Sequence, residues 1–186
     1  MNKENPDVSL VPLQSDDREQ FIKDNQEAFK YGAVEEFGMK DDHFNEEGEI
    51  ISRKTIENSI DKSNSEAYRI MCNGQKVGGV VISINKETLR GELELLFVSP
   101  KIHNNGCGYT AWCLIERMHP EIKVWETITP YFEKRNIHFY VNRCGFHIVE
   151  FLNSFHPGEK KEEDEDDEGP DEGPDEMFRF EKIMHP

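Results

Sequence analysis

Residues 95–109, with the sequence LLFVSPKIHNNGCGY, decide the fold of this chain. An apolar, strand-like run leads into a short polar loop, the loop ends in Gly-x-Gly at Gly106 and Gly108, and a helical pattern begins at once. The helix is indicated by apolar residues at i, i+3, i+4 and i+7, namely Ala111, Leu114, Ile115 and Met118. A strand, a glycine turn and a helix N-terminus leave several backbone N–H groups pointing one way. This arrangement suits a phosphate or pyrophosphate.

Gly-x-Gly alone is equally typical of a plain turn between a strand and a helix. The loop is not the phosphate loop G-x-x-x-x-G-K-[ST], because no Lys-Ser/Thr follows. The dinucleotide fingerprint G-x-G-x-x-G would need glycine where this chain has Ala111, so only the alanine variant of that motif stays open. The residues downstream are needed to choose between a plain turn and a ligand-binding loop.

Three segments follow in order: a strand over 123–128, a short helix over about 131–142, and Cys144-Gly145-Phe146 leading into another strand. This order resembles the GNAT superfamily of acyl-CoA-dependent N-acetyltransferases. Their pattern is V-x-P-x-x-[RQ]-x-x-G-x-G/A, then a strand, then a helix ending Tyr…Gly-Phe. The matching residues are Val98, Pro100, Gly106, Gly108, Tyr140, Gly145 and Phe146. In element order the resemblance covers nearly the whole chain.

Two positions depart from that family pattern. His103 stands where the family usually has Arg or Gln, which removes a charge but not the backbone amides of the loop. Tyr140 is five residues before Gly145, whereas the family's Tyr is commonly four before that glycine. Either an extra residue lies at the end of the helix, or Val141 occupies the usual position.

The resemblance implies an α/β fold with a mixed sheet of six or seven strands, flanked by about four helices, in one domain over residues 1–186. The chain length fits one domain. Strands are also expected over 8–14, 67–72, 75–84, 92–95, 146–152 and 177–183, and helices over about 16–37 and 52–62. Asp16 and Glu19 resemble a helix N-cap pair. Asn73-Gly74 between two strand-like runs is a strong hairpin signal.

The composition favours a cytoplasmic protein. No apolar run approaches the roughly 20 residues needed to span a bilayer, and the N-terminus shows no signal peptide. The four cysteines lack C-x-x-C spacing and are expected to be reduced and mostly buried. The seven histidines show no ligand spacing, so no metal is expected. Trp112 and Trp125 are interpreted as packing groups.

Acidic residues dominate the charge. The twelve Asp and Glu and two Lys of residues 157–176 carry −10 of the formal net charge of −16. A chain this acidic repels nucleic acid. The segment repeats Asp-Glu-Gly-Pro and is expected to be a disordered insertion between the last two strands. It is interpreted as a solubilising insertion, with attraction of a cationic acceptor as the alternative.

The resemblance implies acetyl-CoA as co-substrate, with no metal. The residues implied to bind it are Phe97, Val98, His103, Asn104, Asn105, Gly106, Cys107, Gly108, Tyr109 and Asn136. The backbone N–H of Val98 would face the acyl carbonyl as oxyanion donor. Asn136 and Glu133 are both candidates to contact pantetheine or substrate, and strict spacing from Tyr140 favours Glu133.

Acetyl transfer to an amine needs a base, an oxyanion donor and an acid for the leaving thiolate. Glu92 and Glu94 alternate with leucines, so both carboxylates lie on one strand face, either as base candidates or as solvated side chains. Tyr140, with an ordinary pKa near ~10, is the acid candidate, or else a packing aromatic. Cys107 at a helix N-terminus could have a depressed pKa, but no partner base for acyl transfer is visible.

Three functions follow. The first is an N-acetyltransferase that moves an acetyl group from acetyl-CoA to a primary amine by direct attack in a ternary complex. The second is a catalytically silent acyl-CoA-binding or sensing module, and the third is an acidic interaction protein. Expected partners are an amine-bearing small molecule or peptide, cationic if the acidic segment attracts it, without nucleic acid or membrane. Whether the chain is a homodimer is left open.

Overall fold

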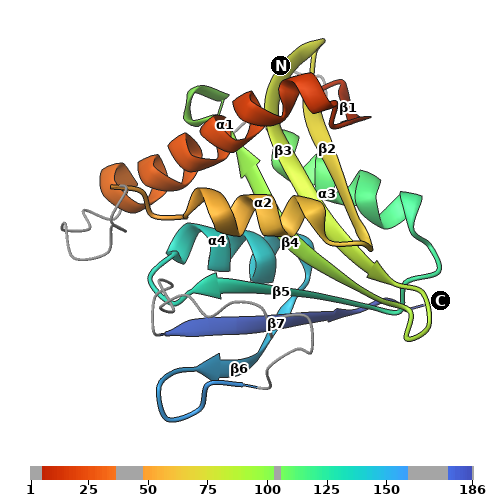
Figure 1. The fold of residues 1–186 in the computed structure, drawn as a ribbon. Coiled ribbons are helices and arrows are strands. Elements are labelled where there is room, and N and C mark those ends of the chain that lie inside the picture. The colour runs from red at the N-terminus through yellow and green to blue at the C-terminus, as the bar shows by residue number, and fades with distance from the viewer. Residues whose placement is uncertain (1–5, 37–47, 103–105, 159–175, 186) are drawn as a thin grey trace, which may run out of the picture.

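A seven-stranded mixed sheet, in the order β1-β2-β3-β4-β5-β7-β6, organises the chain (Figure 1). The structure is a computed structural model and describes residues 6–36, 48–102, 106–158 and 176–185. Neighbouring strands are antiparallel except for β4 and β5, which are parallel. The strands are β1 (Val8–Pro12), β2 (Ser65–Cys72), β3 (Gln75–Asn85), β4 (Arg90–Val98), β5 (Val124–Pro130), β6 (His147–Leu152) and β7 (Met177–Ile183). The α/β class expected from the sequence is confirmed.

Helices cover both faces of the sheet. The α-helices are α1 (Arg18–Tyr31), α2 (Arg53–Asp61), α3 (Cys107–Met118) and α4 (Lys134–His138). Four shorter turns extend or precede them: η1 (Ser15–Asp17), η2 (Gly32–Glu36), η4 (Pro100–Ile102) and η5 (Phe139–Cys144). In Figure 1, α1 and α2 cross one face and α3 lies behind the other. No helix among the described residues is both long and apolar enough to cross a bilayer.

The start of α1 differs from the expected cap. A 3-10 turn over Ser15–Asp17 precedes the helix, and Asp17 occupies the N-cap position without a capping hydrogen bond. Its carboxylate instead accepts a hydrogen bond from Nε of Arg69 at 2.8 Å, and Arg69 is only 2% exposed. Glu19 pairs with Arg53 of α2. The predicted Asp16–Glu19 cap is therefore wrong, because Asp16 lies inside the 3-10 turn and Glu19 pairs with another helix.

The helix expected from Ser52 begins one residue later, because Ser52 caps α2, its Oγ accepting the N–H of Thr55 at 3.0 Å. The hairpin signal is confirmed. Asn73 and Gly74 both have positive φ, of 50° and 78°, and turn β2 into β3 as a tight hairpin. Strands β6 and β7 pair antiparallel, with Leu152 opposite Met177. The acidic insertion thus joins two paired strands, although its residues 159–175 lie outside the described part of the chain.

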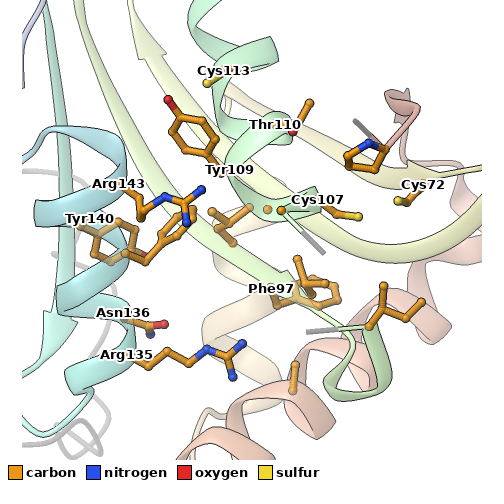
Figure 2. Close-up of a pocket in the computed structure, with 18 of the residues that line it drawn as sticks. Cys72, Phe97, Cys107, Tyr109, Thr110, Cys113, Arg135, Asn136, Tyr140 and Arg143 are labelled. Atoms are coloured by element: carbon orange, nitrogen blue, oxygen red, sulfur yellow. The ribbon is translucent and has the colours of Figure 1, made fainter. Parts of the chain in front are cut away.

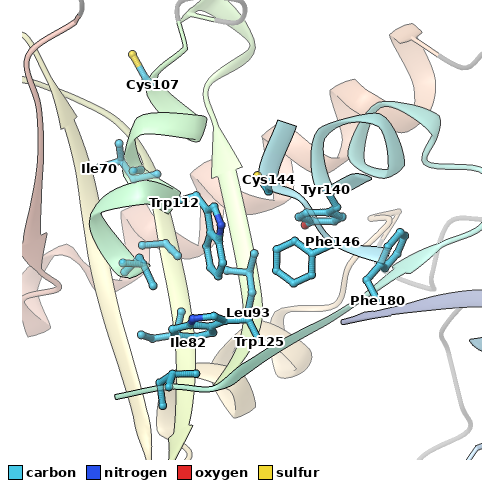
Figure 3. Packing of buried hydrophobic residues seen from close by; sticks show 14 of the residues in the cluster. Ile70, Ile82, Leu93, Cys107, Trp112, Trp125, Tyr140, Cys144, Phe146 and Phe180 are labelled. Carbon is cyan, nitrogen blue, oxygen red and sulfur yellow. The ribbon is translucent and has the colours of Figure 1, made fainter. Parts of the chain in front are cut away.

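The two tryptophans form the centre of the core on the α3 side (Figure 3). Trp112 and Trp125 are fully buried, with ring centroids 5.1 Å apart in an edge-to-face contact. Their packing role is confirmed. The expected apolar stripe of α3 is right only in part: Ala111 and Ile115 are fully buried, but Met118 ends the helix and is 46% exposed. A second core, with Phe21, Ile22 and Ile56 at its centre, lies under α1 and α2.

Candidate active site

A bulge in β4 changes the direction in which its side chains point. Val81 pairs with Leu95 and Ile82 with Leu93, so Glu94 is an extra residue opposite β3. As a result Leu93 packs in the core under α3, whereas Leu95 packs in the core under α1 and α2. Without the bulge, residues two apart on a strand would share a face.

Strands β4 and β5 separate immediately beyond this point. They pair only at Arg90↔Val124, Gly91↔Trp125 and Glu92↔Glu126. The next contact is a side-chain one: the hydroxyl of Thr127 donates to the carbonyl oxygen of Leu93 at 2.9 Å. Farther along, β4 has no pairing with β5 within the described residues, and the sheet opens.

The β4 backbone directs hydrogen-bonding groups into this opening. The N–H of Ser99 donates to the carbonyl of Val77 at 2.7 Å, so that pair is hydrogen-bonded. In an antiparallel ladder hydrogen-bonded and non-hydrogen-bonded pairs alternate. Leu96 and Val98 therefore belong to the second kind, and their N–H and C=O groups point away from β3, toward the opening.

A cavity of about 1330 Å³ lies between the end of β4, the start of α3 and the segment from Glu133 to Arg143 (Figure 2). It is large enough to bury a cofactor-sized ligand. Among its lining residues are seven that the sequence predicts to bind acetyl-CoA: Phe97, Val98, Gly106, Cys107, Gly108, Tyr109 and Asn136. Three others predicted with them, His103, Asn104 and Asn105, lie outside the described residues.

The start of α3 provides backbone donors to the cavity. The first intrahelical bond runs from the N–H of Thr110 to the carbonyl of Gly106 at 3.0 Å, so the N–H groups of the preceding turn have no acceptor within the helix. Gly106 has φ +76°, and a Cβ there would meet no atom of the described residues within 4 Å. At Gly108 a Cβ would lie 3.3 Å from Cγ2 of Val98. These open, side-chain-free amides fit a pyrophosphate group.

Arginines on α3, α4 and η5 give the cavity a positive wall in an otherwise acidic chain. Arg143 lies over the ring of Tyr109, with its Cζ 5.1 Å from the ring centroid, and Figure 2 shows it reaching from η5 toward α3. Arg117 and Arg135 also line the cavity. The sequence does not reveal this local reversal of charge, because only the fold brings the three arginines to one cavity. Asn136 extends its Nδ2 toward Thr129 Oγ1, at 3.5 Å.

Tyr140 lines the cavity and also belongs to the core. It is 6% exposed and contacts the rings of Phe146 and Phe180, with centroids 5.8 and 5.5 Å away. Burial raises the pKa of its phenol, while a hydrogen bond with Thr127 lowers it and a nearby carboxylate, Glu133, raises it. The sequence analysis assumed an ordinary pKa near ~10 for this group. The raised pKa keeps the phenol protonated at neutral and mildly alkaline pH.

Glu92 and Glu94 lie outside the lining of the cavity. Glu94 accepts hydrogen bonds from Nζ of Lys62 at 2.7 Å and from the Ser83 hydroxyl at 2.9 Å, and its side chain is 9% exposed. Glu92 stands opposite Ser83 in the register. Both carboxylates are thus on the α2 side of the sheet, and their role as base stays a prediction.

Cys107 is not a reactive thiol. It is 1% exposed, and burial together with the neighbouring Cys72 thiol raises its pKa to about 11. The depressed pKa considered for a helix N-terminus is wrong here, because loss of solvent outweighs the helix dipole. Within the described residues, no group of three His, Cys, Asp or Glu side chains could hold a metal ion.

Comparison with known proteins gives three kinds of match. The model of the Acetyltransferase (GNAT) family matches residues 22–146. The uncharacterized protein YrkN of Bacillus subtilis (strain 168) is 44% identical over 184 residues, which are 98% of this chain and 96% of YrkN. Solved structures match at lower identity.

Two of these structures illustrate the likeness. PaiA N-acetyltransferase from Thermoplasma acidophilum, in complex with coenzyme A, matches with a TM-score of 0.64 at 16% identity over 95% of this chain and 99% of its own. Spermidine N-acetyltransferase from Vibrio cholerae, in complex with CoA and spermine, matches with a TM-score of 0.59 at 14% identity over 95% of each chain. At such identities the likeness concerns the fold.

Proposed function

The chain belongs to the GNAT family of acetyltransferases, and we propose that it transfers an acetyl group from acetyl-CoA to a primary amine by direct attack in a ternary complex. The observation that carries this proposal is the cavity at the divergence of β4 and β5. It joins the amides at the start of α3, the outward-pointing backbone of β4 and the phenol of Tyr140.

In this proposal the first turn of α3 binds the pyrophosphate through the N–H groups of Cys107, Gly108 and Tyr109. Arg143 and Arg117 add positive charge beside it. Acetyl-CoA supplies the acyl thioester. The backbone amides of Leu96 and Val98 point into the opening, where a donor stabilises the oxyanion that develops during acyl transfer.

Tyr140 is the proposed general acid, because it lines the cavity next to the separation of the two strands, where the Thr127 hydroxyl donates to the Leu93 carbonyl. A protonated phenol in a dry site donates its proton to the departing thiolate. For the acceptor we propose an amine-bearing small molecule or peptide. This agrees with the spermidine and ribosomal-protein alanine named as substrates of two structural neighbours.

Calorimetric titration with acetyl-CoA, followed by a thiol-release assay across a panel of primary amines, tests the proposal. Binding with amine-dependent thiol release supports it. Binding without release by any amine favours a silent acyl-CoA-binding module. Absence of binding favours an acidic interaction protein.

A further inference from the structure

Glu133 brings a buried carboxylate to the cavity. The residue is 4% exposed and lines the cavity together with Asn136 and Tyr140. Its main chain is fixed, since its N–H donates to the Pro130 carbonyl at 3.1 Å and its own carbonyl accepts the N–H of Ile137 at 3.0 Å. It precedes α4 directly, yet its side chain makes no capping hydrogen bond.

The side chain of Glu133 lies against the end of α1. A Cβ added at Gly32 would be 3.9 Å from Oε2 of Glu133, so the carboxylate lies beside the end of α1. Because residue 32 is glycine, this position presents no side chain to the carboxylate. The lining next to Gly32 on α1 consists of Ala28 and Phe29. The cavity here combines one carboxylate with an apolar wall.

Other carboxylates are less well placed. Among the described residues, the carboxylates that line the cavity are Asp7 and Glu133. Asp7 precedes β1, at the opposite side of the cavity, where its N–H bonds to Oδ1 of Asn73 in the β2–β3 turn. Glu133 is close enough to Tyr140 for its charge to raise the pKa of the phenol. It is thus the carboxylate within reach of the proposed acid.

Resting on the acetyl transfer proposed above, we propose that Glu133 binds the ammonium group of a primary alkylamine acceptor and takes its proton. The residues that line the cavity beside Glu133 indicate the class of substrate. A buried carboxylate favours a cation over a neutral hydroxyl, and the side chains of Ala28, Phe29 and Phe97 favour an alkyl stem.

The protons balance in this scheme. The ammonium gives one proton to the Glu133 carboxylate and becomes a neutral nucleophile. Its lone pair forms the nitrogen–carbon bond, and the carbon–sulfur bond breaks with its electron pair going to sulfur. Tyr140 protonates the sulfur and regains a proton from the new amide nitrogen. Glu133 then releases its proton to solvent.

The charged and titratable groups around Glu133 shape its pH dependence. Arg135 and His138 on α4, and Tyr140 on η5, line the same cavity. The test therefore compares the kcat/KM of variants across a range of pH, instead of relying on one pH midpoint of the wild type. Glu133→Gln keeps the shape and removes the charge. Glu116→Gln is the matched control, because Glu116 is a largely buried carboxylate outside the cavity, where it pairs with Lys182.

The first measurement is kcat/KM for hexylamine from pH 6 to 10.5. We expect Glu133→Gln to lose on the order of 10²-fold or more near pH 7. The loss should shrink as pH approaches the amine pKa of roughly 10.4, where neutral amine no longer needs a base. Glu116→Gln should keep the wild-type profile, and both variants should keep the wild-type dissociation constant for CoA.

The second measurement needs no turnover: binding of hexylamine and of 1-hexanol to the CoA-loaded protein at pH 7. The wild type should prefer the ammonium by tenfold or more, and Glu133→Gln should abolish that preference. An unchanged preference and pH profile in Glu133→Gln would overturn the role of Glu133 while leaving acetyl transfer intact.

Different results would overturn the proposed acetyl transfer and the proposed role of Glu133. Thiol release absent from the wild type with every amine overturns acetyl transfer, and the binding comparison still decides whether Glu133 holds an ammonium. If Glu133→Gln does not fold, Glu133→Asp replaces it. That variant keeps the charge but shortens the side chain, so it should retain the preference for the ammonium and lose at least tenfold in kcat/KM. Wild-type kcat/KM in Glu133→Asp would also overturn the assignment.

Discussion

The backbone N–H of Gly145 donates to the carbonyl oxygen of Tyr140, five residues earlier. This bond closes a π-type turn over Phe139–Cys144, which holds one residue more than an α-helical turn. Relative to the family pattern, the extra residue between Tyr140 and Gly145 is thus accommodated inside the helix. Tyr140, rather than Val141, lines the cavity. Its role as general acid is a proposal that the first variant tests.

Tyr140→Phe should lower kcat by about 10²–10⁴-fold, because only the proton donor of the transition state is lost. The dissociation constant for CoA should stay nearly unchanged. Steady-state kinetics and calorimetric titration measure the two quantities. Tyr109→Phe, a change at another cavity tyrosine, is the control and should keep kcat. Full activity in Tyr140→Phe would favour a packing role.

Gly106→Val should weaken CoA binding at least tenfold, because a β-branched side chain would enter the space in front of the amides. It also places valine at φ +76°, which costs about 1–2 kcal/mol of stability. Gly74→Val is a matched control, since Gly74 has φ +78° and equally open surroundings in the β2–β3 turn. Both variants should lose stability in urea unfolding, but only Gly106→Val should lose CoA affinity. Equal CoA affinities in the two variants would contradict pyrophosphate binding at the start of α3.

Asp17→Asn should destabilise the fold by about 3 kcal/mol, the low end for removing one partner of a buried ion pair, since Asp24 still pairs with Arg69. The hydrogen bond from Arg69 holds the pKa of Asp17 below its ordinary 3.8. Its stabilising effect is therefore complete well above the ordinary pKa of 3.8 and is lost as pH falls through the lower folded-state pKa. Urea unfolding at pH 7 and pH 3 should show a smaller acid loss in Asp17→Asn than in the wild type.

Replacing residues 159–175 by a short Gly-Ser turn should leave β6 and β7 paired, because loop length changes closure entropy only weakly. We expect a similar or higher melting temperature, since a run of like charges is removed. If the segment attracts cationic acceptors, the KM for a polyamine should rise at low salt. This difference should fade near physiological salt, where the Debye length is roughly 8 Å. An unfolded variant would contradict the hairpin placement.

The sequence predicts those parts of the fold that depend on neighbouring residues. The Asn73-Gly74 turn and the helix after Gly106 follow from local backbone chemistry. The expected cap at Asp16 fails because a 3-10 turn moves the N-cap position to Asp17, whose carboxylate is bound by Arg69, about fifty residues away. Such competition between distant partners is not visible in a local pattern.

The same limit applies to the site. The cavity residues from 97 to 109 follow one another in sequence, so a single motif predicts them together. Glu133 and Arg143 reach the cavity only because β5 turns away from β4 beyond Glu92. Alternation placed Glu92 and Glu94 on one strand face, but it could not show that this face meets α2 rather than the cavity.

Only three residue pairs join β4 to β5, so the sheet consists of two halves with a short joint between them. One half consists of strands β1–β4 and the other of strands β5–β7, and the ladders within each half are longer than the joint between them. Native-state hydrogen exchange should then resolve two cooperative units with different opening free energies. A ligand that spans the cavity contacts both halves of the sheet, so saturation with CoA should slow amide hydrogen exchange in both units at once.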